Sequence, residues 1–456
     1  MKILKIYSLL IISLLMSQCG FLDETSPNDL DAATAISNGA SAQAALIGCY
    51  SSMQNGSSYG GQFALISEAC GGNAQTGGYN YISLDQLGAR EVTPANLLVE
   101  ELWAALYRTI TNTNRLLTAL PNIKDLPDAQ KKDIEGQARA IRGMVHFDIL
   151  RYFGEHWNQN SALGIPVIQT TQTLQDAPNR ATVSASYAAI INDLSAALTL
   201  IDPANKAIQF MTKSGVNSLL SRVYLYKGDK VKAAAHATEV INTGDFALVD
   251  AANYGTIFNK RLTSESIFEL KFDNQNRSAF NGLTYGRDSA IRSEISFIAD
   301  TILNAFFQSR TGDKRADLLD FVHNNTTILP SGRTQKYRGE ESRDNSAYMM
   351  RFAEMYLIRA EANGRVAGLT DLNLIRVQRG LTALTAADVA TDAAYQTAIL
   401  DENQAEFNFE GHRYFDLARM RQLEAVTGIK NFRSIMPIPG REIIASKGAI
   451  AQNQGY

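Results

Sequence analysis

The chain has 456 residues, of which 45% are hydrophobic and 20% charged, so it can bury a large core as one big domain or two intimate ones. Its formal net charge is −3 and no block of basic residues occurs, which makes nucleic acid and anionic membrane surfaces poor candidate partners. The three cysteines are too few to indicate a disulfide scaffold. Cys49 and Cys70 can pair in an oxidising compartment or remain reduced, and the sequence leaves both states open.

The first residues have the composition of a secretory signal. Two lysines precede an apolar run over residues 6–16, and Cys19 follows closely. The run is much shorter than the roughly 20 apolar residues that cross a bilayer, and we expect no later stretch to qualify. We therefore predict a lipoprotein signal peptide over residues 1–18, lipidation of Cys19, and an anchor and tether over residues 19–38. An ordinary cleaved signal with an incidental cysteine is the alternative.

Most of the periodic pattern along the chain is helical. Apolar side chains recur every three or four residues over 98–117 and again over 138–152, which predicts an antiparallel helix pair. A second pair is indicated around Gly228–Asp229, where Ser221 and Ala233 are small enough for two helices to approach closely. The offsets in this pair match the tetratricopeptide pattern of about 34 residues. Further helices are expected over residues 184–200, 347–363, 372–379, 393–409 and 412–423.

These patterns predict a mostly α fold. We expect a tetratricopeptide-like scaffold of helix pairs, an α-α superhelix, with long ligand-binding loops and a few short strands. The loop-rich binding region is predicted at about residues 50–90 and 265–340, which are rich in Gly, Asn and Arg with interspersed aromatic residues. Loops this long are usually functional or disordered, and their aromatic content argues against plain disorder.

The two loop-rich stretches contain the residue types that bind sugars or peptides. Flat aromatic rings stack on apolar sugar faces and peptide side chains, while amide and guanidinium groups hydrogen-bond to hydroxyl or carbonyl groups. The candidate ligand-binding residues are Tyr59, Asn73, Tyr79, Asn80, Tyr81, Arg277, Phe280, Asn281, Tyr285 and Arg287. For each tyrosine, ordinary packing of a half-buried loop is the alternative.

The sequence shows no catalytic constellation. None of the five histidines has the spacing of a zinc-protease helix, and no nucleophile elbow, phosphate-binding loop or dinucleotide fingerprint occurs. His146 and His412 lie in helical segments, where a structural or surface role is expected. Trp103 and Trp157 are expected in the core or at a helix junction, which leaves Tyr and Phe for any stacking surface. We therefore predict no enzyme activity, no cofactor and no metal site, and no EF-hand-like spacing indicates calcium.

Several segments are similar to one known family when they are read in order. They are ARAIRGMVHFDILRYFGE (138–155), SLLSRVYLYKGDKVKAAAHATEVI (218–241), MRFAEMYLIRAEA (350–362), EFNFEGHRYFDLAR (406–419), MPIPGREI (436–443) and QNQGY (452–456). Together with the lipoprotein-like start, they resemble the SusD/RagB family of outer-membrane nutrient-binding lipoproteins over nearly the whole chain. The resemblance implies that residues 39–456 form a single SusD/RagB-like domain, lipid-anchored to the outer membrane and facing the cell exterior.

The same resemblance implies a role. Members capture an oligomeric nutrient, a glycan or in some cases a peptide, and deliver it to a TonB-dependent (SusC-like) outer-membrane transporter, without being enzymes. The matched segments are mainly scaffold and transporter-facing parts, so they transfer the architecture and not the ligand. A helical-repeat scaffold lipoprotein that binds another surface protein without a nutrient ligand is the alternative.

Overall fold

The computed structural model describes residues 35–76, 81–172, 176, 178–280, 297–320, 332–337 and 344–456. The predicted signal peptide, Cys19 and all but the last four residues of the predicted tether lie outside this set. Within it, helices predominate, and the strands form three two-stranded antiparallel sheets. The prediction of a mostly α fold with a few short strands is confirmed.

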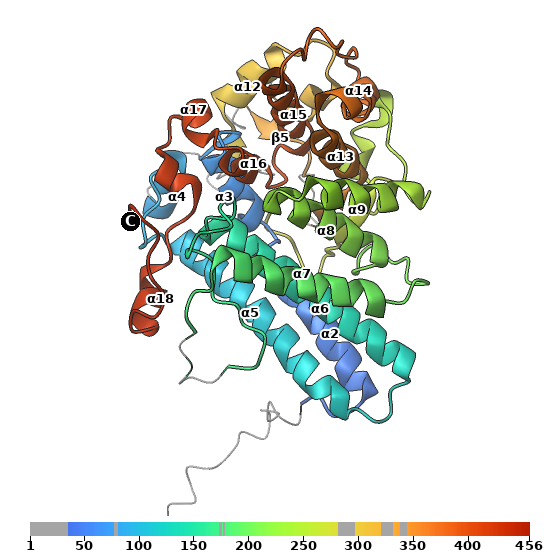
Figure 1. Ribbon diagram of the computed structural model, residues 1–456, viewed down its shortest axis with the longest axis vertical. Coiled ribbons are helices and arrows are strands. Elements are labelled where there is room, and N and C mark those ends of the chain that lie inside the picture. Colours follow the sequence, from blue (N-terminus) through green and yellow to red (C-terminus); the bar gives the residue numbers. More distant parts are fainter. Residues whose placement is uncertain are drawn as a thin grey trace, which may run out of the picture.

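The N-terminal half is a layer of long helices, drawn in blue to green in Figure 1. It contains α2 (Gly39–Met53), α5 (Leu97–Ala119), α6 (Asp128–Phe153) and α7 (Val183–Leu200). The antiparallel pair predicted over residues 98–117 and 138–152 is α5 and α6. Helix α5 begins at an N-cap, where the Asn96 side chain accepts a hydrogen bond from the Val99 N–H. Nearly every residue of α6 after Ile134 is buried, so it is the central helix of the layer.

The α7 helix corrects one expectation about membrane-spanning segments. By length and composition, Val183–Leu200 is apolar enough to cross a membrane, although we expected no such stretch beyond the first residues. One face of the helix, including Tyr187, Ile190 and Leu194, is buried, and the helix packs between α6 and the helix that follows it. This is the arrangement of an apolar helix within a helical layer.

The second predicted pair is also present. It consists of α8 (Lys213–Lys227) and α9 (Lys230–Asn242), and the Ser221 hydroxyl of one helix donates to the Ala233 carbonyl of the other at 2.9 Å. This contact requires the two helices to approach closely, as the small side chains of Ser221 and Ala233 predicted. The α9 helix packs on α13 (Phe352–Ala367), which packs on α14 (Leu369–Gln378) and α15 (Asp392–Phe407). Successive stacked pairs of this kind confirm the tetratricopeptide-like scaffold.

The turn between α8 and α9 provides a test of this pair. Gly228 has φ +89°, and a Cβ there would meet nothing within 4 Å, so alanine would cost only backbone strain. We expect Gly228→Ala to lower the free energy of unfolding by about 1–2 kcal/mol, the cost of the left-handed conformation for an L side chain. Urea unfolding measures this change. Gly368 has a right-handed φ of −81°, but it is tightly packed and is therefore no suitable control. The control is Lys230→Ala at an exposed position, which should change the free energy of unfolding by less than about 0.5 kcal/mol.

Two predicted helices differ from the structure at their ends. The first five residues of the stretch 347–363 form β6 (Ala347–Arg351), which pairs antiparallel with β2 (Ser266–Leu270). Every residue of both strands is buried, and a short strand buried on both faces has no alternation that distinguishes it from a helix. The stretch 412–423 divides into α16 (Arg413–Arg419) and α17 (Leu423–Thr427).

The two stretches expected to be loop-rich contain more regular structure than predicted. The first contains the end of α2, α3 (Gln62–Cys70), β1 (Ala74–Thr76) and α4 (Ile82–Gly88). The second contains β2, β3 (Phe297–Ala299), α12 (Thr301–Gln308), β4 (Leu319–Asp320) and β5 (Arg333–Thr334). The remaining short elements are η2 (Leu120–Asn122), η3 (Ala251–Asn253), α10 (Thr256–Asn259), η5 (Lys314–Leu318), η6 (Asn431–Ser434) and α18 (Gly440–Ala445).

Some of the glycines in the first stretch allow close packing. A Cβ at Gly60 would lie 2.3 Å from the Gln54 carbonyl oxygen, and one at Gly71 would lie 2.7 Å from the Tyr414 nitrogen. Because real Cβ atoms do not approach so closely, no other residue fits at either position. These glycines therefore bring α2, α3 and α16 together, and their abundance does not by itself indicate an open loop.

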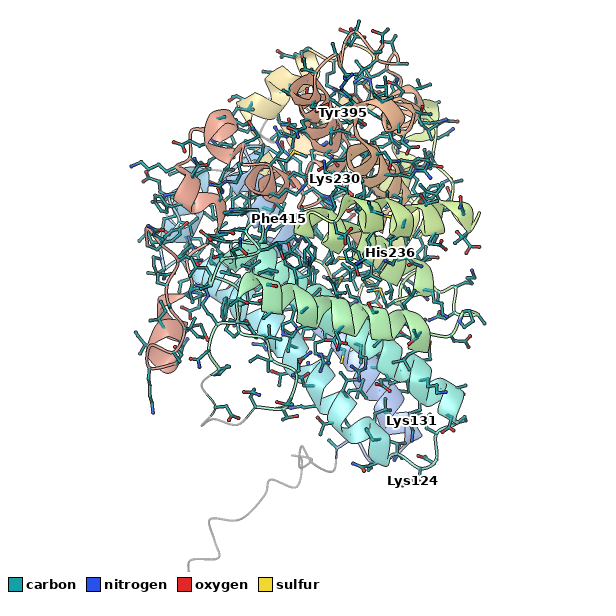
Figure 2. All side chains as sticks on the ribbon, in the orientation of Figure 1. Lys124, Lys131, Lys230, His236, Tyr395 and Phe415 are labelled. Carbon is teal, nitrogen blue, oxygen red and sulfur yellow. The ribbon has the colours of Figure 1, made fainter. Side chains whose placement is uncertain are left out.

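The helical layers meet at an aromatic cluster around Phe415. Its ring lies 4.7 Å from that of Tyr152 on α6 and 5.9 Å from that of Phe63 on α3. Phe415 is fully buried and lies near the middle of the view in Figure 2, whereas Lys124 and Lys131 lie at the far end of the long-helix layer. The main core cluster thus extends from the long helices to the C-terminal helices.

Candidate functional site

The predicted binding residues do not form one site in the structure. Five of the ten predicted ligand-binding residues, together with the lipidation site Cys19, lie outside the described residues. They are Tyr79, Asn80, Asn281, Tyr285 and Arg287. Of the other five, Tyr59 and Phe280 line an internal cavity, and Arg277 lines an open groove. Tyr81 directly precedes α4 and is 37% exposed, while Asn73 is fully buried.

Asn73 is held by protein partners on both sides of its amide. Its Nδ2 donates to Glu68 Oε2 at 2.6 Å, and its Oδ1 accepts from Gln404 Nε2 at 2.8 Å. Glu68 Oε1 also accepts the backbone N–H groups of Gly411 and His412. Asn73 therefore joins α3 to α15 and to the start of α16, and its side-chain amide is already used by the fold.

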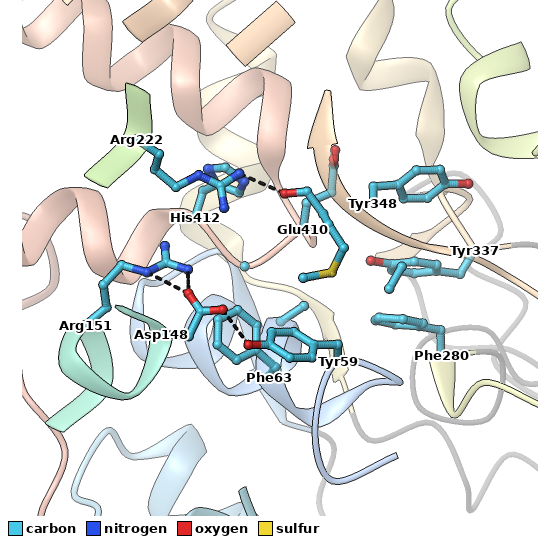
Figure 3. A pocket seen from close by; sticks show the side chains of 14 residues that line it. Tyr59, Phe63, Asp148, Arg151, Arg222, Phe280, Tyr337, Tyr348, Glu410 and His412 are labelled. Atoms are coloured by element: carbon cyan, nitrogen blue, oxygen red, sulfur yellow. Dashed lines mark hydrogen bonds and ion pairs between the residues drawn. The ribbon is translucent and has the colours of Figure 1, made fainter. Parts of the chain in front are cut away.

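The internal cavity is shown in Figure 3. At one end, Tyr59 Oη donates to Asp148 Oδ2 at 2.6 Å, and Asp148 is paired with Arg151. At the other end, the Phe280 ring stacks on Tyr337 with ring centroids 4.0 Å apart. Tyr59 and Phe280 are at most 2% exposed, so both rings are packed in the interior and are not presented at the surface.

The chemistry of this cavity is that of a structural junction. Burial, with the Asp148 carboxylate beside it, raises the pKa of Tyr59 well above its usual value, so the phenol stays protonated. Burial and Arg222 hold the pKa of His412 well below its usual value, so the imidazole stays neutral. The free space is about 20 Å³, enough for about one water molecule and far too little for a sugar ring.

The open groove lies between α2 and α5, and we call it the α2–α5 groove. Its free volume is about 440 Å³, within the range of about 300–1,000 Å³ of small-ligand sites. On α2, positions 48, 51 and 52 share one helix face, and on α5, positions 105, 108 and 112 share another. The groove is lined by Gly48, Ser51, Ser52, Gln54, Asn55, Gly56, Ala105, Arg108, Asn112, Asn276 and Arg277.

The loop that completes the groove is held in place by hydrogen bonds. Gln54 Nε2 donates to the Lys271 carbonyl, and Asn276 Nδ2 donates to Gln54 Oε1, both at 2.5 Å. Arg277 Nε donates to the Asn274 carbonyl at 2.9 Å, which fixes the guanidinium and leaves its two terminal nitrogens for other partners. A rim fixed in this way loses little conformational entropy when a ligand binds.

Gly48 is unusual because it lies inside a helix without a packing reason. A Cβ at this position would meet no atom within 4 Å, and the backbone φ is not in the left-handed region. Glycine inside a helix costs about 0.5–1 kcal/mol relative to alanine. The glycine therefore lowers helix stability with no packing requirement, and no neighbouring side chain of the described protein occupies the space beside it.

The polar groups of the groove are available to a ligand. Ser51, Arg108 and Asn112 make no side-chain hydrogen bond or ion pair with the other described residues, and all three face the groove. Hydroxyl, amide and guanidinium groups in such a setting can satisfy the hydroxyl groups of a saccharide. Sequence reasoning found Arg277 and missed the helical members, because exposed polar residues on helices are common. The glycine at position 48 was the one signal that could have indicated them.

Both tryptophans, with His146 and His412, occupy buried or half-buried structural positions, as expected. His146 Nε2 accepts the Ile168 N–H at 3.1 Å, and burial lowers the pKa of this imidazole to about 3. Trp103 is 3% exposed in the core, and Trp157 is half-buried in the turn after α6 with Arg421 stacked over its ring. Cys49 and Cys70 are both buried free thiols, which answers the pairing question left open by the sequence.

Comparisons with known proteins give the family. A model described as "Starch-binding associating with outer membrane" matches residues 20–225, and the SusD family model matches residues 320–436. SusD-like protein P2 of Formosa agariphila is 24% identical over 516 residues, which cover 99% of this chain and all of that one.

Solved structures show the same fold. A SusD superfamily protein from Bacteroides thetaiotaomicron aligns with a TM-score of 0.78 and 23% identity, over 90% of this chain and 98% of the other. A laminarin binding SusD-like protein aligns with a TM-score of 0.76 and 22% identity, over 92% and 100% of the two chains. Surface glycan-binding protein A from Bacteroides thetaiotaomicron, in complex with laminarihexaose, aligns with a TM-score of 0.75 and 18% identity, over 91% and 100%. With family models matching both halves and a relative aligned end to end, the chain belongs to the SusD/RagB family.

Proposed function

We propose that this protein is a surface lipoprotein that captures a glycan and delivers it to a TonB-dependent outer-membrane transporter. The α2–α5 groove carries the proposal, because it is open, large enough for a small oligosaccharide and lined by polar groups. The family description associates one matching model with starch binding at the outer membrane, and related structures are named for laminarin and surface glycans.

The lining favours a glycan over a peptide. Its side chains are hydroxyl, amide and guanidinium groups, and its small residues are two glycines and one alanine. A peptide usually gains affinity by inserting apolar side chains into apolar pockets, which this lining does not offer. A saccharide presents many hydroxyl groups in fixed directions, and the amides and arginines of the groove can pair with them.

The anchor and the transporter partner belong to the same proposal. Lipidation of Cys19 would hold the protein on the membrane by about 0.8 kcal/mol per buried CH₂ of each acyl chain. The tether over residues 19–38 leads directly into α2, which begins at Gly39 and lines the groove. A Cys19→Ala variant that stays in the membrane fraction, or a protein that never copurifies with a TonB-dependent transporter, would contradict this part.

Filling the groove tests the binding site. In a chain that starts at residue 20, we expect Gly48→Phe to weaken oligosaccharide binding at least about tenfold, since the ring would occupy the open space. Stability should be unchanged or improved, because a helix glycine is removed. Calorimetric titration against glycan and peptide panels measures affinity, and thermal unfolding measures stability.

The matched control is Gln43→Phe, an exposed position on α2 that does not line the groove. It should retain full binding. If no glycan binds the unmodified chain, or if only peptides bind, glycan capture is wrong. If glycans bind equally well to the Gly48→Phe variant, the α2–α5 groove is not the capture site.

A further inference from the structure

We infer that the α2–α5 groove selects saccharides that carry negative charge, as sulfate esters or uronate carboxylates, through Arg108 and Arg277. This inference rests on the proposed function and adds a ligand class to it. The observation behind it is the charge of the lining, because the described residues that form the groove include two arginines and no carboxylate.

Many other arginines in the described part of the chain are paired with carboxylates. Arg142 lies 2.6 Å from Asp193, Arg222 lies 2.5 Å from Glu354, and Arg359 lies 2.7 Å from Asp371. Neither groove arginine has an ion pair with a described carboxylate. A pair of uncompensated cations in a concave site attracts an anionic ligand.

The two arginines approach the groove from different elements. Arg108 projects from α5 beside Asn112, while Arg277 belongs to the loop tied to Gln54 through Asn276. Since Arg277 Nε is already bonded to the Asn274 carbonyl, its terminal nitrogens remain as a two-pronged donor. That geometry matches the paired oxygens of a sulfate or a carboxylate.

The groups around the arginines suit the rest of a sugar ring. Ser51, Asn55 and Asn112 supply hydroxyl and amide groups, and Gly48 leaves space for the ring between the helices. A free inorganic anion would use only the arginines, whereas a charged saccharide uses both the arginines and the uncharged donors. The combination therefore favours an anionic sugar over either a neutral sugar or a bare anion.

Paired ligands that differ only in charge test the inference. A sulfated oligosaccharide is compared with its desulfated form, and an oligouronate with its carboxyl-reduced form, by calorimetric titration against the chain that starts at residue 20. We expect at least one charged form to bind about tenfold tighter than its neutral counterpart at low ionic strength. Because both arginines are exposed, this advantage should largely disappear at high salt.

Arginine variants assign the effect to the groove. We expect Arg108→Gln and Arg277→Gln each to weaken binding of the charged ligand about three- to fivefold. Binding of the neutral ligand should fall clearly less, because glutamine keeps a hydrogen-bond donor for a sugar hydroxyl and only the charge is lost. The matched control is Arg115→Gln, an exposed arginine on α5 that does not line the groove. It should leave both affinities unchanged.

The outcomes separate this inference from glycan capture itself. Equal binding of charged and neutral forms overturns the charge selection and leaves glycan capture intact. An equal loss in the Arg115→Gln variant also overturns it, since general attraction to the protein would then explain the preference. If the charged member binds tighter in the sulfate pair only, or in the uronate pair only, the inference is supported and the source of the charge is identified. Binding of no saccharide at all means that the proposed function has failed.

Discussion

Glu406→Gln is expected to lower the free energy of unfolding by about 3–5 kcal/mol. Glu406 lies on α15 with a fully buried side chain, and it accepts hydrogen bonds from Arg315 at 3.1 Å, Arg351 at 2.8 Å and Arg379 at 2.9 Å. Glutamine keeps the shape of the side chain but removes its charge. Three buried guanidinium groups then lose the carboxylate they share.

The loss is large because Glu406 is central to a buried ionic network. The network joins the start of β2, η5, the end of β6, the end of α14, and α15. Its members, each with a side chain at most 1% exposed, are Glu265, Asp313, Arg315, Lys336, Arg351, Arg379, Glu402, Glu406 and Glu410. At its edge, Arg310 and Arg376 pair with Glu402, and their side chains are 10% and 13% exposed. Buried charges are tolerated only when such pairing is complete.

The effect of Glu406→Gln should depend on pH. Burial opposes ionisation of Glu406, but Arg379 and Arg351 outweigh it and hold the pKa of this carboxyl well below its usual value. Its contribution to stability is therefore fully present above the unfolded pKa of about 4.3 and is lost as pH falls toward the folded value. The stability difference between wild type and variant should be largest near neutral pH and should shrink below about pH 4.5.

Urea unfolding at a series of pH values measures both effects. Burial raises the pKa of Glu265 in the same network, but both proteins contain this group, so comparing them largely removes its contribution. The control is Glu424→Gln, an exposed carboxylate outside the network, which should change stability by less than about 0.5 kcal/mol. A Glu406→Gln variant as stable as wild type at neutral pH would contradict the account.

The helix pairs were predictable because their signals are local. Leu98, Leu102 and Leu106 repeat at the helical period on α5, and the Gly228–Asp229 turn has the residues that end one helix and cap the next. The strand β6 was mistaken for the start of a helix because all of its residues are buried. These residues form a strand because they pair with β2, which is distant in the chain, and such pairing produces no periodic pattern in the sequence.

The ionic network could not be predicted for the same reason. Arg351 and Glu406 lie in two of the segments that identified the family, but they are separated by 55 residues in the chain. In sequence, each is an ordinary charged residue beside apolar ones. Only the stacking of α13 against α15 and the pairing of β2 with β6 brings them together.

Of the predicted binding residues, only Arg277 lines the proposed groove, and its role in binding stays a prediction. Composition favoured the aromatic residues of glycine-rich segments as binding residues. Glycines such as Gly60, however, allow tight packing, and both Tyr59 and Phe280 are buried. The groove instead depends on two helices whose polar faces look solvent-exposed in sequence. Their side-by-side packing, which sequence periodicity does not encode, is what makes Gly48 and Arg108 neighbours of one cleft.

Arg222→Met is expected to cost about 3–5 kcal/mol, whereas the double variant Arg222→Met/Glu354→Leu should recover most of that loss. Arg222 on α8 donates from Nε and Nη2 to the two carboxylate oxygens of Glu354 on α13, at 2.5 Å and 2.6 Å. Both side chains are at most 6% exposed. The single change leaves the Glu354 carboxylate buried without its partner, and the double change removes both charges.

Recovery should be incomplete by about 1 kcal/mol, because Arg222 Nη2 also donates to the Met349 carbonyl at 2.8 Å and no replacement serves that oxygen. Urea unfolding of wild type, both single variants and the double variant gives the coupling energy between the two positions. A double variant destabilised by the sum of the two single changes would show that the pair does not act as a unit. Recovery would show that the family scaffold tolerates apolar contact between α8 and α13, and that the charged pair is not needed for the stability of this helix packing.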